Sequence, residues 1–129
     1  MKRPRLLNPH LYEINALLFM ERMRCTYGAD CTLGKVPRSE WEKIASKGFS
    51  YLWLMGIWER SPGSKQCALK DAGLTKAYCD ALPGWSEKDV KGSPYAVHSY
   101  VIDPSIGTGE ELRNLRSLLK ELGMGLILD

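Results

Sequence analysis

Hydrophobic residues gather in three short runs that are almost free of polar breaks. The runs cover residues 11–20, 49–55 and 124–128, and only the first contains clear interruptions, at Glu13 and Asn15. Apolar runs of this length are typical of parallel strands that are covered on both faces. We therefore predict one strand in each run, with the chain between residues 21 and 37 forming a loop.

Two capping boxes mark the starts of helices. Ser39 is followed three positions later by Glu42, and the apolar positions after it repeat on one helical face until Gly48. In such a box the hydroxyl and the carboxylate each accept from the other residue's main-chain N–H. Thr108 opens a second box, and the helix that it predicts ends at Gly123. The apolar faces are predicted to contain Trp41, Ile44 and Ala45 in the first helix and Leu112, Leu115, Leu118, Leu119 and Leu122 in the second.

Helix, glycine turn and buried strand thus occur twice in the same order. This repeat is the mark of right-handed βαβ units and a parallel sheet, so the fold class is α/β. Between the repeats, residues 61–94 form a long excursion rich in Pro and Gly, with short helices expected near 67–72 and 76–81. Neither of the glycine-rich nucleotide-binding motifs is present, which argues against a dinucleotide or P-loop protein.

Composition narrows the class of protein further. The chain has 129 residues, enough for one domain but fewer than the about 250 of a complete (β/α)8 barrel. The net charge is +3, and the basic residues are scattered along the chain except for the cluster of Lys2, Arg3 and Arg5. No nucleic-acid partner is therefore expected. No secretory segment is predicted, because Asn8, Pro9 and His10 interrupt the apolar run after Leu6 and Leu7. No membrane span is predicted either, because no stretch reaches the about eighteen apolar residues that a span needs. We expect a soluble, cytoplasmic protein.

Four cysteines occur without metal-binding or disulfide spacing. They contain no C-x-x-C pair, and neither histidine lies at a zinc-ligand distance along the chain. We predict free thiols, no metal site and no cofactor. The cysteines are Cys25, Cys31, Cys67 and Cys79, and the histidines are His10 and His98.

Candidate binding residues follow the predicted strands, because parallel α/β folds place their sites at the carboxyl ends of strands. Trp58, Glu59 and Arg60 follow the second strand and suit a polyhydroxylated ligand that both stacks and hydrogen-bonds. The alternative is a loop-packing tryptophan beside a surface ion pair. Asp129 follows the third strand, and Tyr95 could stack on a sugar ring, although buried loop tyrosines without such a role are commoner.

The residues also carry a likeness to a known family. The segments are Y-E-I-N at 12–15, L-W-L-M-G-I-W-E-R-S-P at 52–62, G-S-P-Y-A-V at 92–97, V-I-D-P at 101–104 and G-M-G-L-I-L-D at 123–129. Together they resemble the start of the α-amylase family of glycoside hydrolases, in the same order and spacing. The resemblance implies that residues 1–129 are the amino-terminal part of a TIM (β/α)8 barrel, truncated after strand three.

The resemblance also implies a reaction and a division of roles. Family members act on α-glucosidic bonds as retaining hydrolases or transglycosidases, with catalytic carboxylates after strands four, five and seven. These lie beyond residue 129, so we expect an inactive fragment and no catalytic residue here. The resemblance makes Tyr95 a sugar-stacking residue and Asp129 the first residue of a substrate-binding motif. Any calcium site of a parent enzyme would depend mostly on residues outside this stretch.

Three further expectations stay open at the level of sequence. Ser99 stands where the family usually has Asp, which predicts a weaker, neutral hydrogen bond in that loop. Three strands of a closed barrel would leave open edges, which predicts self-association. A non-catalytic sugar-binding or scaffold protein, and a small α/β domain without a ligand, are the alternative interpretations.

Overall fold

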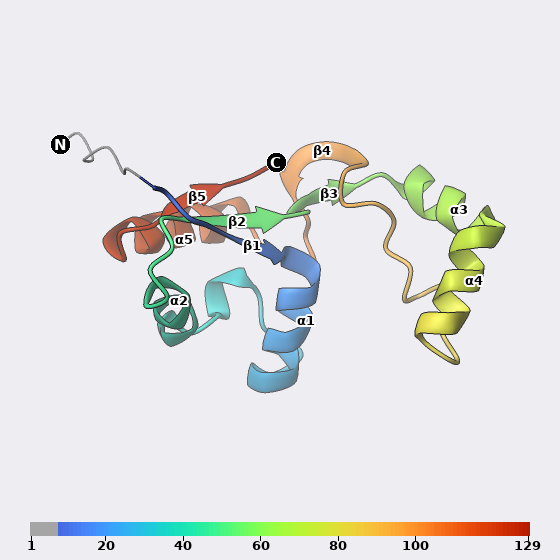
Figure 1. Cartoon of the computed structure of the whole chain (residues 1–129), viewed down its shortest axis with the longest axis horizontal. Helices are drawn as coiled ribbons and strands as arrows, with labels where there is room; N and C mark the ends of the chain where they lie inside the picture. Colours follow the sequence, from blue (N-terminus) through green and yellow to red (C-terminus); the bar gives the residue numbers. More distant parts are fainter. Residues whose placement is uncertain (1–7) are drawn as a thin grey trace.

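The computed structural model describes residues 8–129. The predicted basic cluster of Lys2, Arg3 and Arg5, and the leucines at 6 and 7, lie outside the described residues. The elements in chain order are β1 (Leu11–Asn15), α1 (Ala16–Tyr27), the 3₁₀ helix η1 (Leu33–Lys35), α2 (Arg38–Ala45), β2 (Tyr51–Met55), β3 (Trp58–Arg60), α3 (Pro62–Lys70), α4 (Ala72–Ala81), β4 (Val97–Ile102), α5 (Gly109–Glu121) and β5 (Gly125–Ile127) (Figure 1).

A parallel sheet of three strands organises the fold, in the order β1-β2-β5. Asn15 at the end of β1 lies beside Met55 at the end of β2, and Trp53 of β2 lies beside Ile127 of β5. The predicted α/β class with parallel strands is therefore confirmed. Because the strands run the same way, their carboxyl ends meet at one edge of the sheet.

The sheet buries one face, whereas the sequence pattern predicted two. Leu52 and Leu54 of β2 are 0% and 1% exposed, while Tyr51, Trp53 and Met55 between them are only partly buried. The buried residues join a core with α1, α2 and α5, in which the Phe19 and Trp41 rings lie 5.1 Å apart. The prediction was wrong because large apolar residues also occupy the uncovered face.

The first apolar run divides between a strand and a helix. β1 ends at Asn15, whose side chain accepts a hydrogen bond from the Leu18 N–H at 3.2 Å and so caps α1. The predicted strand over 11–20 is wrong beyond that point, and so is the loop over 21–37, since α1 continues to Tyr27 and η1 follows. The buried face of α1 has helical spacing, with Ala16, Phe19, Met20 and Met23.

The two predicted capping boxes had different outcomes. α5 has its box as expected: the Thr108 N–H donates to Glu111 Oε2 at 2.7 Å, and the Glu111 N–H donates to Thr108 Oγ1 at 3.2 Å. The box at Ser39 is not formed, because the N-cap of α2 is Pro37, two residues earlier, and the helix has no side-chain cap. Pro37 has φ −58°, which already suits a helix start.

Residues 61–94 form the predicted excursion, with α3 and α4 beginning earlier than expected. Both helices stand to one side of the sheet (Figure 1), and neither buries a residue completely. Of the buried hydrophobic residues, Val90 alone comes from this segment. Two strands were not predicted: β3 leads into the excursion and pairs antiparallel with β4, which follows it.

All four cysteines are free thiols, and Cys31 alone is buried. Within residues 8–129 no group of three metal-ligating side chains comes together. In the same range no helix has the length and apolar character needed to cross a bilayer.

Candidate functional site

Trp58 and Asp129 meet at the carboxyl edge of the sheet. Gly56 follows β2 with φ +73°, a conformation that favours glycine, and turns the chain into β3. Its N–H donates to Asp129 Oδ1 at 3.4 Å, and the Trp58 indole N–H donates to the Asp129 main-chain carbonyl oxygen. The structure thus brings together two of the residues that the sequence singled out.

Trp58 belongs to an exposed pair of aromatic rings. Its ring lies edge-on to that of Tyr100, with centroids 5.7 Å apart and planes at 77°. Tyr100 is 76% exposed, whereas Trp58 is partly buried and packs against the core, and the β3–β4 pairing holds the two rings together. A partly exposed tryptophan that is fixed by a hydrogen bond and a neighbouring ring offers a preorganised stacking surface.

Arg60 extends from the end of β3 into a shielded position. Its Nη1 donates to the main-chain oxygen of Gly92 at 2.9 Å, while Nε and Nη2 are shielded from solvent and have no hydrogen-bond partner among residues 8–129. Burial lowers the pKa of the Arg60 guanidinium, and the charges of Asp103 and Asp129 oppose that shift. Nε and Nη2 form one edge of the planar group, the geometry with which Arg donates two parallel hydrogen bonds.

Gly56 also makes room for this guanidinium. A Cβ atom at position 56 would lie 2.9 Å from Arg60 Nη2 and 2.8 Å from the Cβ of Pro94. The close approach explains why glycine is required there for space as well as for its positive φ.

Glu59 and Ser99 connect β3 and β4. The Ser99 hydroxyl donates to Glu59 Oε2 at 2.7 Å. The weaker neutral bond expected at Ser99 is therefore replaced by a hydrogen bond to a carboxylate, which is the stronger kind. The contact holds the β3–β4 ribbon on which Trp58 and Tyr100 stand.

Tyr95 lies apart from the other predicted residues. Its side chain is 64% exposed, and its N–H donates to Ser93 Oγ at 3.2 Å. Within residues 8–129 its ring makes no aromatic contact. The structure therefore gathers Trp58, Arg60 and Asp129 and leaves Tyr95 on the surface.

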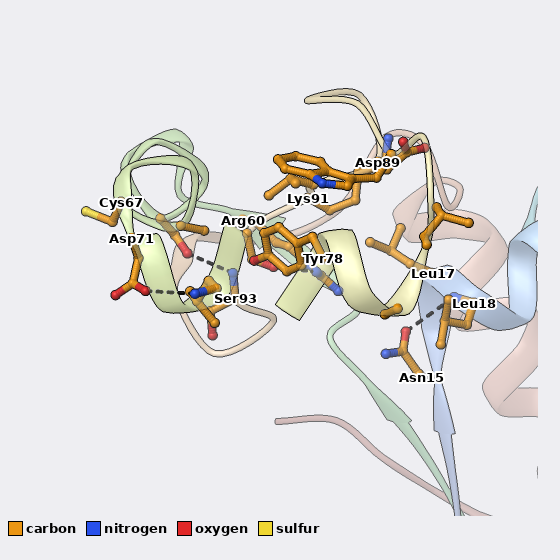
Figure 2. A pocket seen from close by; sticks show the side chains of 18 residues that line it. Asn15, Leu17, Leu18, Arg60, Cys67, Asp71, Tyr78, Asp89, Lys91 and Ser93 are labelled. Carbon is orange, nitrogen blue, oxygen red and sulfur yellow. Dashed lines mark hydrogen bonds between the residues drawn. The ribbon is translucent and has the colours of Figure 1, made fainter. Parts of the chain in front are cut away.

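A pocket of about 670 Å³ lies between α1 and the excursion, and sequence reasoning missed it. Arg60 and Asn15 reach it from the carboxyl edge of the sheet, and Tyr78 faces it from α4 (Figure 2). A sequence signal existed, since Leu74, Tyr78 and Leu82 repeat every four residues. The pocket is lined by Asn15, Leu17, Leu18, Arg60, Ser64, Cys67, Ala68, Asp71, Leu74, Tyr78, Ala81, Leu82, Trp85, Asp89, Val90, Lys91, Gly92 and Ser93.

Comparisons of the chain with protein-family models, with curated proteins and with solved structures found no match. The fold and site define a mixed α/β protein with an aromatic and basic cluster at the carboxyl edge of a parallel sheet.

Proposed function

We propose that this chain forms the amino-terminal part of an α-amylase-type barrel and that its carboxyl edge binds an α-glucoside. The observation that carries the proposal is the convergence of Trp58, Arg60 and Asp129 at that edge. (β/α)8 barrels bind their ligands at the carboxyl ends of the strands. The sequence resemblance supplies the family and the class of glucoside.

The sheet is consistent with a barrel segment in two respects. Its neighbours β1, β2 and β5 are parallel, and the strands β1 and β2 are joined through helices that pack into the core on one face. The opposite face carries Tyr51, Trp53 and Met55, which are only partly buried. In a closed barrel such a face would be covered by side chains of the remaining strands.

Each residue of the cluster has a distinct role in the proposal. The face of Trp58 stacks on a sugar ring, Asp129 accepts from its hydroxyl groups, and Arg60 donates to them once its side chain turns its shielded Nε and Nη2 toward the ligand. Tyr95 would add a second stacking surface if its loop closes over the ligand. The thiols of the four free cysteines favour a cytoplasmic location.

Binding, and not bond cleavage, is the activity that we assign to residues 1–129. A retaining glycosidase needs two carboxyl groups roughly 5 Å apart on opposite sides of the scissile bond. Glu59 is held by Ser99, and Asp129 is held by the turn at Gly56. The resemblance places the catalytic carboxylates on later strands of the barrel.

The test is an NMR titration of the ¹⁵N-labelled chain with maltotriose, with cellotriose as the β-linked control. We expect maltotriose to shift the indole N–H of Trp58 with a millimolar dissociation constant, and Trp58→Phe to abolish the binding. Trp53→Phe is the matched control, because Trp53 lies on β2 outside both the cluster and the pocket lining, and this variant should bind as the unmodified chain does. Equal shifts with cellotriose, or none at Trp58, would refute α-glucoside binding at this edge.

A further inference from the structure

The excursion presents an apolar surface that the protein core does not use. α3 and α4 have no completely buried residue, and Leu74 and Leu82 are 44% and 53% exposed. Leu18 of α1, 67% exposed, faces them across the pocket. The excursion and α1 therefore form two walls with solvent-exposed apolar side chains, and a pocket of about 670 Å³ lies between them.

Two aromatic residues of the excursion line this pocket. The rings of Tyr78 and Trp85 lie edge-on, with centroids 5.2 Å apart and planes at 69°. Ring pairs of this kind add specific contacts to an apolar wall. The pocket thus offers aliphatic and aromatic surface over most of its length.

The pocket and the carboxyl edge share Asn15 and Arg60. Asn15 is the last residue of β1, and its side-chain oxygen caps α1 at the mouth of the pocket. Arg60 lies between the cluster around Asp129 and the pocket, with its Nε and Nη2 unpaired. A ligand bound at both places would meet polar groups near Arg60 and apolar groups beyond it.

The carboxylates that line the pocket have local partners. Asp71 Oδ1 accepts from the Leu74 N–H at 2.8 Å and caps α4. Asp89 Oδ2 accepts from the Ser86 N–H at 2.7 Å. Arg60 and Lys91 balance these two charges, so the lining has no net charge that would select an ion. A long glucan would find few hydrogen-bonding partners on such walls.

We propose that this pocket receives the apolar, aryl or alkyl, aglycone of an α-glucoside whose sugar lies at the carboxyl edge. The inference rests on the proposed function and names the substrate class of the same site. Arg60 stands at the junction, and it donates to the sugar or to the glycosidic oxygen after its side chain turns the shielded Nε and Nη2 toward the ligand. Leu74, Tyr78 and Trp85 contact the aglycone.

The experiment compares methyl α-glucoside with p-nitrophenyl α-glucoside on the full chain, with the indole N–H signals followed by NMR. Both probes should shift Trp58, but only the aryl glucoside should shift Trp85. Burial of an aryl group of this size predicts about tenfold or greater tightening. Leu74→Ala should weaken the aryl glucoside several-fold and leave the methyl glucoside unchanged.

Leu11→Ala is the matched control, because Leu11 is also 44% exposed and does not line the pocket. This variant should bind both probes normally. If the aryl glucoside shifts Trp58 but not Trp85, and Leu74→Ala has no effect, the aglycone pocket is wrong while glucoside binding stands. Free p-nitrophenol is a third probe. If it shifts the Trp85 indole signal and neither glucoside shifts the Trp58 indole signal, both proposals are wrong.

Discussion

Arg60 holds a guanidinium where part of its hydrogen-bonding capacity has no protein partner. One nitrogen donates to Gly92, and the other two are shielded and unpaired. Shielded donors without partners cost free energy, and here the cost appears as a lowered pKa caused by burial. A group kept in this state at the edge of a sheet is better suited to a ligand than to stability.

Arg60→Met should therefore separate binding from stability. Methionine keeps much of the aliphatic contact and removes the unpaired donors, so the free energy of unfolding should change by less than about 1 kcal/mol. Binding of α-glucosides should be lost. Urea denaturation and the NMR titration measure the two quantities, and Arg60→Lys provides a control that retains the charge. A loss of more than about 2 kcal/mol would make Arg60 a structural residue.

The sequence predicts some residues of the candidate site but not the contacts that they make. Trp58 and Asp129 could be found because parallel strands end at a common edge, and each lies within three residues of the end of an apolar run. The partner of Arg60 could not be found, because Gly92 lies 32 residues along the chain and is brought back by the excursion. The exposure of Tyr95 likewise depends on how the loop after Gly92 closes.

At the scale of elements, the carboxylate of Glu111 connects α5 to the segment before α2. Its Oε2 accepts from the Thr108 N–H, and its Oε1 accepts from Thr32 Oγ1 at 2.6 Å. Gly34 and Gly107 leave space for it, since a Cβ at either position would lie 2.6 or 2.4 Å from its oxygens. One side chain thus fixes both a helix start and a loop.

Glu111→Ala should lower the free energy of unfolding by about 1 to 2 kcal/mol, because it removes the reciprocal cap and the partner of Thr32. Glu110→Ala is the matched control, since Glu110 lies in the same first turn and is not part of the capping box. Urea denaturation of the two variants measures the difference. Equal effects would mean that the charge of the first turn matters and the cap does not.

Elements with local signals were easier to predict than those that depend on distant pairing. α5 carries its cap, apolar stripe and glycine stop within the segment itself. α1 was missed because its first residues continue the apolar run of β1, and the cap at Asn15 resembled a polar interruption. β3 and β4 were missed because they are short and stabilise each other across residues 61–96.

At the scale of the molecule, the parallel sheet has two outer strands and one uncovered face. Within residues 8–129, β1 and β5 each pair on one side only, and Leu11 and Ile127 are 44% and 38% exposed. The uncovered face also holds Trp53, whose shielded indole N–H has no hydrogen-bond partner in the part of the chain that the structure describes. Exposed strand edges of this kind favour pairing with another chain.

The isolated chain should accordingly self-associate as its concentration rises. A lysine on the edge should oppose this, so Ile127→Lys should shift the distribution toward the monomer in sedimentation velocity experiments. Val101→Lys is the control, because Val101 is 60% exposed on β4 and lies outside this sheet. A strictly monomeric chain at all concentrations would show that the edges are protected.

Residues 61–94 contribute little to the hydrophobic core, so this segment can vary without disturbing the packing of the rest of the protein. Only Val90 of this segment is buried among the hydrophobic residues, while the sheet and α1, α2 and α5 pack without it. The excursion can therefore be exchanged for another loop with little loss of the scaffold. Ligand preference would change with the new loop, so the chain separates into a packed frame and a replaceable recognition segment.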